Sequence, residues 1–355
     1  MTLPSVLQEL LTTPGPSGRE VAAAEVWRRH AGAFATVESD VVGSSVARVP
    51  GTSDDADLVP SLAIVGHIDE IGLIVTHIDE RGFLRVAQVG GWDPQQLVGQ
   101  RVELITRDGP VAGVVGKKPI HLMESDDRTR AAKLKELSID IGAADREDAQ
   151  KVVRIGDVAV IDVRPLELRG GRFASRSMDN RIGSFVAYET ARLVAEDGGA
   201  AGEVQAWACA QEETGLSGAK TTAHRVRPDI AVVVDVTFAS DQPGVDSNEI
   251  GEHALGSGPV IERGTPLHPW VTDTLIEIAE REGIDHTVAA VGRATGTDAD
   301  AVHIAADGIA TAVVSVPLRY MHSSVETAEI ADIHATAKLL AAFARTLDAD
   351  VDLRR

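Results

Sequence analysis

The chain has 355 residues, of which 54 are acidic and 34 basic, so its formal net charge is −20. Nucleic acid and anionic membranes repel a surface of this charge, and we expect neither as a partner. No basic segment followed by an apolar run opens the sequence, and no stretch approaches the roughly 18 apolar residues of a membrane-spanning helix. These features predict a cytoplasmic protein whose single cysteine, Cys209, is a buried thiol rather than a nucleophile.

The N-terminal part of the chain carries one helix signal and one strand signal. Ser17 and Glu20 have the spacing of a capping box, which predicts a helix that begins at residue 21. The apolar run at 62–65 is typical of a buried parallel strand. It ends on His67 and Asp69, and open α/β sheets bind their ligands at such strand ends.

Residues 71–163 have a different texture, with short β-like runs separated by turn signals such as Gly90-Gly91 and Asp108-Gly109-Pro110. This pattern predicts an inserted smaller β-rich domain, either PDZ-like or barrel-like. It would interrupt a catalytic domain whose two parts are residues 1–70 and 164–355.

The part after the insert alternates between the two kinds of element. Strand-like runs lie at 204–210, 230–236 and 310–316, and helix-like runs lie at 181–195, 271–281 and 330–347. This alternation predicts an α/β fold with a mainly parallel sheet covered by helices.

Six side chains that can bind metal follow predicted strands or lie in turns beside them: His67, Asp179, Glu212, Glu213, Asp235 and His322. Each signal is weak alone, because a lone histidine is usually structural and an aspartate before a helix is usually an N-cap. Together they offer the nitrogen and oxygen donors that suit zinc, cobalt or manganese. A shared carboxylate can hold two such ions about 3.5–4 Å apart, which points to hydrolytic chemistry.

Adjacent Glu212 and Glu213 can take different roles, because neighbouring residues of an extended chain point to opposite sides. One could bind metal while the other faces the attacking water as a base. Asp69 lies two residues after His67, on the same side of an extended strand. There it could hydrogen-bond the imidazole and set its tautomer.

Motifs spread over nearly the whole chain resemble those of one known family. They are His-Ile-Asp-Glu-Ile-Gly at 67–72, Met-Asp-Asn-Arg at 178–181, Gln-Glu-Glu-Thr-Gly-Leu-Ser-Gly-Ala at 211–219, Asp-Val-Thr at 235–237, Gly-Thr-Asp-Ala at 296–299 and Met-His-Ser-Ser-Val-Glu at 321–326. They are similar to the motifs of the tetrahedral, self-compartmentalising dimetal aminopeptidases, the glutamyl and deblocking aminopeptidase group.

The resemblance implies a ligand set for two divalent ions, zinc or cobalt first and manganese as a third choice. His67 and Asp235 would bind one metal, Glu213 and His322 would bind the other, and Asp179 would bridge them.

The resemblance also implies that Glu212 is the general base and that the substrates are peptides, from which N-terminal residues are removed. In this chain Asn180 follows the bridging aspartate, where family members often have a second Asp. Any role of that second carboxylate is therefore open here.

Other enzymes remain as alternatives. A dimetal carboxypeptidase or an N-acyl amino-acid deacylase could use the same ligand types, and N-blocked peptides would distinguish them. An endoglucanase would need a sugar cleft usually lined with aromatic side chains, whereas the chain has only 4 Trp, 2 Tyr and 6 Phe. A non-catalytic assembly protein would be expected to lack the base Glu212.

Several other polar residues have no assigned role. We expect five histidines at the surface or in the core: His77, His121, His253, His268 and His303. Arg293 could favour acidic N-terminal residues, although an exposed or ion-paired arginine is the commoner case.

The insert needs a function of its own, because the proposed ligands His67 and Asp179 flank it and none lies within it. We expect a dimerisation module. The resemblance implies that dimers build a homo-oligomer, a tetrahedral dodecamer with the active sites inside.

Overall fold

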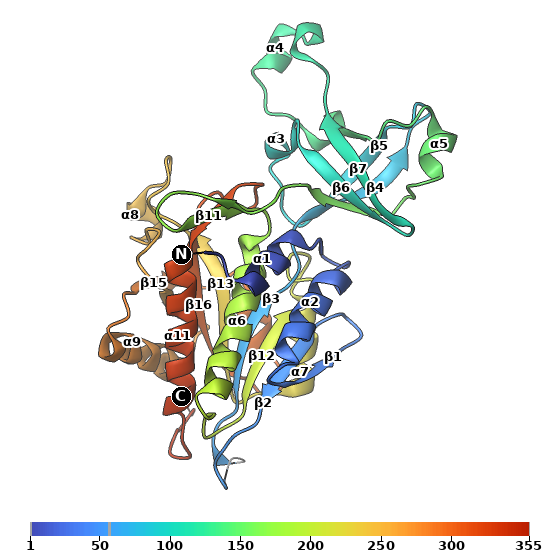
Figure 1. Ribbon diagram of the computed structural model, residues 1–355. Helices are drawn as coiled ribbons and strands as arrows, with labels where there is room; N and C mark the ends of the chain where they lie inside the picture. The colour runs from blue at the N-terminus through green and yellow to red at the C-terminus, as the bar shows by residue number, and fades with distance from the viewer. Residues whose placement is uncertain (1, 56–57, 355) are drawn as a thin grey trace.

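The computed structural model describes residues 2–55 and 58–354. It has a large α/β part and a smaller barrel that stands apart from the main sheet (Figure 1). This architecture confirms the predicted α/β class with an inserted β-rich domain. Within the described residues, no helix is both long and apolar enough to cross a bilayer.

The main sheet contains eight strands among the described residues, in the order β1-β2-β12-β3-β13-β16-β14-β15. Their bounds are β1 Thr36–Ser39, β2 Ser45–Val49, β3 Leu62–His67, β12 Val204–Cys209, β13 Ile230–Phe238, β14 Val260–Gly264, β15 Thr287–Val291 and β16 Ala310–Leu318. The central neighbours β12, β3, β13 and β16 run parallel. Antiparallel β2 and β14 flank them, so the predicted parallel sheet forms the middle of a mixed one.

Helices cover both faces of this sheet. Their bounds are α1 Ser5–Thr12, α2 Val21–Ala31, α6 Met178–Glu196, α7 Ser217–Val226, α9 Pro269–Glu282, α10 Ala299–Val302 and α11 Ile330–Thr346. Side chains of α1, α2, α6, α9 and α11 share one core, and those of α7 and α10 share another.

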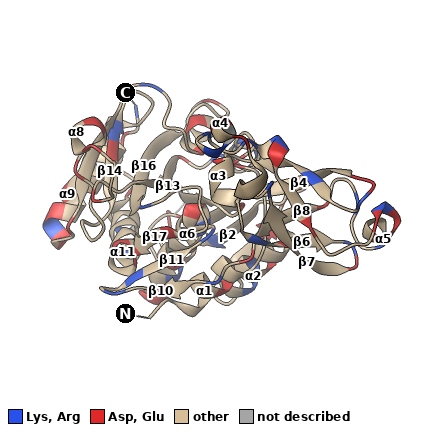
Figure 2. Cartoon of the chain, turned by 90° about the horizontal axis from the view of Figure 1, so that it is seen from above, with Lys and Arg blue, Asp and Glu red and all other residues tan. Residues whose placement is uncertain are grey.

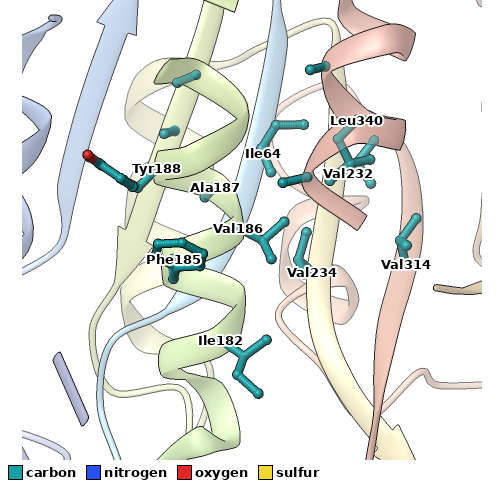
Figure 3. Packing of buried hydrophobic residues seen from close by; sticks show 14 of the residues in the cluster. Ile64, Ile182, Phe185, Val186, Ala187, Tyr188, Val232, Val234, Val314 and Leu340 are labelled. Carbon is teal, nitrogen blue, oxygen red and sulfur yellow. The ribbon is translucent and has the colours of Figure 1, made fainter. Parts of the chain in front are cut away.

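The strands supply both cores because successive side chains point to opposite faces of a sheet. In β3, Leu62 and Ile64 belong to the α6 side, whereas Ala63 and Val65 belong to the α7 side. Figure 3 shows Ile64 packed with residues of α6 and of the neighbouring strands on the α6 side. The continuous apolar runs of the sequence therefore reflect strands buried on both faces.

The barrel is closed by six described strands in the order β4-β5-β8-β7-β6-β9. Their bounds are β4 Gly72–Ile78, β5 Leu84–Val89, β6 Arg101–Thr106, β7 Gly109–Gly116, β8 Ser138–Asp140 and β9 Val158–Ile161. Leu84, Leu104 and Ile139 lie in a core of its own. The short elements around it are α3 Pro94–Leu97, η2 Ile120–Leu122, α4 Ser125–Arg128, η3 Leu134–Glu136 and α5 Arg146–Gln150. The exact domain boundaries, 70/71 and 163/164, stay a prediction.

A small sheet, β10-β11-β17, joins the segment after the barrel to the C-terminal part of the chain. Its strands are β10 Leu166–Glu167, β11 Arg172–Ser175 and β17 Glu326–Glu329, and the short helix α8 spans Ser247–Ile250. The sequence pattern did not predict this sheet.

The predicted capping box is wrong, although the helix itself begins at Val21 as expected. Ser17 makes no cap hydrogen bond; its hydroxyl lies 2.9 Å from that of Thr214. The Glu20 carboxylate accepts hydrogen bonds from the backbone amides of Gly18 and Gln211. Contacts with the loop after β12 thus replace the local cap.

Candidate metal centre

The carboxyl ends of the central strands bring the predicted residues to one edge of the sheet. His67 is the last residue of β3 and pairs with Cys209, the last residue of β12. Glu212 and Glu213 follow in the loop after β12, and Asp235 lies on β13. Parallel strands that end together place their following residues in one crevice.

The N-terminal end of α6 brings Asp179 to the same edge. A Cβ atom on Gly66 would lie 2.2 Å from the carbonyl carbon of Gly183, so β3 and α6 pack backbone against backbone. The Ser184 hydroxyl donates a hydrogen bond to the His67 carbonyl at 2.7 Å. This close approach holds the start of α6 over the end of β3.

Asp179 lies between two imidazoles. Its Oδ1 is 3.2 Å from His67 Nε2, and its Oδ2 is 3.3 Å from His322 Nε2. His322 Nε2 also lies 3.2 Å from Glu213 Oε1, and His67 Nε2 lies 3.8 Å from Glu212 Oε2. The two carboxylate oxygens of Asp179 therefore face two different histidines.

The donor atoms form two groups of three that could each hold a metal ion. The groups are His67, Glu212 and Asp235, and His67, Asp179 and Glu213; the atoms of each group lie within 4.8 Å of one another. His67, Asp179 and Asp235 are buried. A compact, buried set of imidazoles and carboxylates fits divalent zinc, cobalt or manganese.

The electrostatics of the site also favour bound cations. Burial raises the pKa of Glu212 to about 9, and the nearby carboxylates of Asp235 and Glu213 add to the increase. Burial likewise raises the pKa of Asp235 well above its usual value. Buried carboxyl groups that lie close together ionise readily only when a positive charge, such as a metal ion, lies beside them.

The two imidazoles of the site can supply positive charge when they are protonated. Burial alone would lower the pKa of His322, but hydrogen bonds to Asp179 and Glu213 raise it to about 11. Burial would also lower the pKa of His67, but the carboxylates around this imidazole raise it well above its usual value. Without metal, both rings therefore tend to hold protons that a metal ion would displace.

Asp69 connects a histidine with the two glutamates. Its Oδ1 lies 3.4 Å from His67 Nδ1 and accepts a hydrogen bond from the Glu212 amide at 3.0 Å. Its Oδ2 accepts from the Glu213 amide at 3.1 Å. Fully buried Asp69 thus lies where it can orient His67 and the loop that carries Glu212 and Glu213.

Two supporting residues were missed from the sequence. Glu326 accepts hydrogen bonds from the backbone amides of His322 and Asp179, at 2.9 and 3.2 Å. The His322 Nδ1 lies 2.7 Å from the Gly91 carbonyl, in the loop that follows β5 of the barrel. Both residues lie in segments that the sequence singled out, the motif at 321–326 and the turn signal Gly90-Gly91, but neither pattern indicated a contact with the centre.

The glycines of that loop permit this approach. Gly90 has φ +73°, and a Cβ atom there would lie 3.0 Å from the Glu213 carboxylate. Any side chain would be strained and crowded at this position. The barrel therefore touches the centre through its backbone.

Asn180, which replaces the second aspartate of the resemblance, has a structural role. Its amide nitrogen donates to the Val234 carbonyl at 2.8 Å, and its Oδ1 accepts from the Gly183 amide at 2.8 Å. Asn180 is fully buried and fixes the first turn of α6 to β13.

A cavity of about 370 Å³ opens onto the predicted ligands. It is lined by His67, Asp179, Glu212, Glu213, Asp235, Val236, Thr237, Phe238, Glu262, Thr295, Gly296, Thr297, Met321 and His322. The five histidines without an assigned role are not among these residues. His268 and His303 line a different cavity of about 720 Å³, beside the amino ends of β13 and β16.

Comparison with known proteins agrees with this geometry. The family model described as M42 glutamyl aminopeptidase matches residues 43–339. The lysyl aminopeptidase of Pyrococcus furiosus is 36% identical over 313 residues, which cover 88% of this chain and 87% of that protein.

Solved structures share the fold over nearly the whole chain. A TET aminopeptidase from a marine sediment archaeon of the Thaumarchaeota has a TM-score of 0.90 at 31% identity, covering 97% of this chain and 96% of its own. The TET1 peptidase of Pyrococcus horikoshii has a TM-score of 0.84 at 32% identity, covering 96% and 99%. These matches confirm the predicted resemblance and the aminopeptidase class: the chain belongs to the M42 family of glutamyl aminopeptidases.

Proposed function

We propose that this protein removes N-terminal residues from peptides with two divalent metal ions per chain, zinc or cobalt first and manganese as a third choice. The observation that carries the proposal is the position of Asp179, whose two carboxylate oxygens face His67 and His322 on opposite sides. One carboxylate between two nitrogen donors is the arrangement that a pair of bridged ions requires.

The ligands divide into two sets around that bridge. His67 and Asp235 would hold one ion, and Glu213 and His322 would hold the other. Two ions held there would polarise the peptide carbonyl and lower the pKa of the attacking water. The resemblance and the short distances within the cluster support this division.

Glu212 is the proposed general base. Its carboxylate lines the cavity beside His67 but makes no ion pair with His322, unlike its neighbour Glu213. Glu212 would take a proton from the attacking water and give it to the leaving amine. Asp69 would hold His67 and the Glu212 backbone in place during this transfer.

A single assay distinguishes an aminopeptidase from a carboxypeptidase and from an N-acyl amino-acid deacylase. The metal-loaded protein is incubated with one peptide in three forms: free, N-acetylated and C-amidated. The proposal predicts release of N-terminal residues from the free and the amidated forms and none from the acetylated form. Cleavage of the acetylated form alone would identify a deacylase, and loss from the C-terminus a carboxypeptidase.

We also propose a closed homo-oligomer, a tetrahedral dodecamer built from dimers through the barrel at 71–163. The similar TET1 peptidase of Pyrococcus horikoshii can assemble into a tetrahedron or a large octahedral shell. The barrel region exposes five large apolar side chains that such a contact could cover: Val114, Ile120, Leu122, Val152 and Ile155. Such a shell would admit peptides and exclude folded proteins.

Peptides are the only partners that we propose besides further copies of the chain, and the cytoplasm stays the proposed location. Figure 2 shows acidic and basic residues mixed along α5 and α9 in the view drawn. This mixture, with a net charge of −20, supports the expectation that nucleic acid and membranes are not partners.

A further inference from the structure

Glu262 is a buried carboxylate in the catalytic cavity that the proposed mechanism does not use. It lies on β14, is 7% exposed, and lines the cavity together with the metal-ligand set. The Ser315 hydroxyl donates a hydrogen bond to its Oε1 at 3.0 Å. Its Oε2 has no hydrogen-bond partner among the described residues.

The surroundings of Glu262 provide no cationic side chain to its carboxyl group. No lysine, arginine or histidine of the described chain lies within ion-pair distance of it, and the cavity lining contains neither lysine nor arginine. Burial raises the pKa of Glu262, against a smaller opposing effect of the Ser315 hydrogen bond. Burial therefore favours the neutral form of this carboxyl group, and a cation brought into the cavity beside it would favour the charged form.

The position of β14 sets how far Glu262 lies from the reacting centre. Asp235 on β13 is paired with Ser315 on β16, and β16 pairs with β14 on its other side. Two strand spacings, about 10 Å between backbones, therefore separate the strand of the proposed ligand Asp235 from the strand of Glu262. Long, flexible side chains such as those of lysine and arginine suit this separation.

We infer that Glu262 is a specificity-determining residue that selects peptides with lysine or arginine at the N-terminus. The inference rests on the proposed aminopeptidase function. With the scissile carbonyl at the metal ligands, the first side chain enters the cavity and its cationic end reaches the free Oε2 of Glu262. Arg293, which could have favoured acidic residues, is exposed and does not line the cavity.

The test compares chromogenic substrates of lysine, arginine, leucine and glutamate on the metal-loaded protein. We expect kcat/KM for lysine and arginine to exceed the value for leucine by about 10- to 100-fold, as a charge-assisted hydrogen bond would give. Glu262→Gln should remove this preference and leave the leucine value within about threefold. Glu277→Gln, at an exposed position of α9, is the matched control and should keep the preference.

Product inhibition gives a second measurement that does not depend on turnover of basic substrates. Free lysine should inhibit leucine-substrate hydrolysis about 10-fold more strongly than norleucine, which has the same stem without the ammonium group. Glu262→Gln should abolish the difference. Equal inhibition of the wild-type protein by the two amino acids would overturn the inference.

The outcomes separate this inference from the proposed function. If the wild-type protein hydrolyses leucine substrates but prefers neutral, polar or acidic residues over basic ones, the aminopeptidase stands and the role of Glu262 is wrong. An unchanged basic preference in Glu262→Gln overturns it equally. No hydrolysis of any free aminoacyl substrate by the metal-loaded protein would instead contradict the function.

Discussion

The Asp69 carboxylate accepts a hydrogen bond from the backbone amide of Glu212, although the two residues are 143 positions apart. The same carboxylate lies 3.4 Å from the imidazole of His67. A residue just after β3 thus contacts both a proposed metal ligand, the last residue of that strand, and the loop after β12 that carries the proposed base. Small changes at Asp69 should therefore affect catalysis without removing a ligand.

We predict that Asp69→Asn lowers kcat by about 10- to 100-fold, the usual effect of losing a group that orients a metal ligand. The carboxylate uses one oxygen for the Glu212 amide and the other for the Glu213 amide. An asparagine has one acceptor oxygen, so one amide would face an NH₂ group. Kinetics are compared with Asp108→Asn, at an exposed turn of the barrel; equal activities would contradict the role of Asp69.

Asp179→Asn should lower metal occupancy at both positions, because the proposed bridge contributes one oxygen to each. Elemental analysis after exhaustive dialysis measures the metal content per chain, and circular dichroism checks the fold. Asp108→Asn again serves as the control. Retention of two tightly bound ions by the variant would exclude the bridge.

Activity should fall as the pH decreases, because protons compete with metal for His67 and His322. Hydrogen bonds to Asp179 and Glu213 raise the pKa of His322 to about 11 against the opposing effect of burial, so this imidazole favours its protonated form at neutral pH and must lose a proton to bind metal. For each proton displaced, apparent metal affinity should fall about tenfold per pH unit.

The acid limb of the pH profile should therefore move to lower pH when zinc or cobalt is added in excess. The profile is recorded at several metal concentrations with a neutral aminoacyl substrate. A limb that stays fixed would show that another group controls it.

Replacing Ile120 and Leu122 by glutamate should break the proposed assembly into smaller species. Both side chains are exposed, at 58% and 65%, on η2 of the barrel region, and charges there would oppose an apolar contact. Light scattering compares this variant with Val41→Glu, which changes an exposed position of the α/β part. If the particle keeps its size, the segment with Ile120 and Leu122 is not part of the contact between subunits.

The sequence predicted which residues gather at the strand ends better than it predicted the groups around them, and their roles as metal ligands stay a prediction. His67 and Asp235 follow from apolar strands with polar ends, a pattern that is local. Glu326 and Gly91 support the centre through backbone contacts across 147 and 231 positions, and no local pattern encodes such contacts. The capping-box prediction was wrong for the same reason, because the Glu20 carboxylate accepts a hydrogen bond from the backbone amide of the distant Gln211.

The order of strands in the sheets could not be predicted for the same reason, because neighbouring strands can be far apart in the sequence. Glu262 lies on a five-residue strand, β14, whose antiparallel place beside β16 brings it to the cavity. Closure of the barrel likewise depends on pairing β4 with β9, about 80 residues apart in sequence. Apolar runs and turn signals predicted the elements, whereas the folded structure showed which elements are neighbours in space.

The proposed role of Glu212 as general base is tested most directly by the turnover of Glu212→Gln at matched metal content. The change removes a base but no proposed ligand, so the variant should bind both ions and lose about 10²–10⁴-fold in kcat. Glu280→Gln, at an exposed position of α9, should keep full activity. Full turnover by Glu212→Gln with its metals in place would contradict the assignment of this residue and of the catalytic centre built around it.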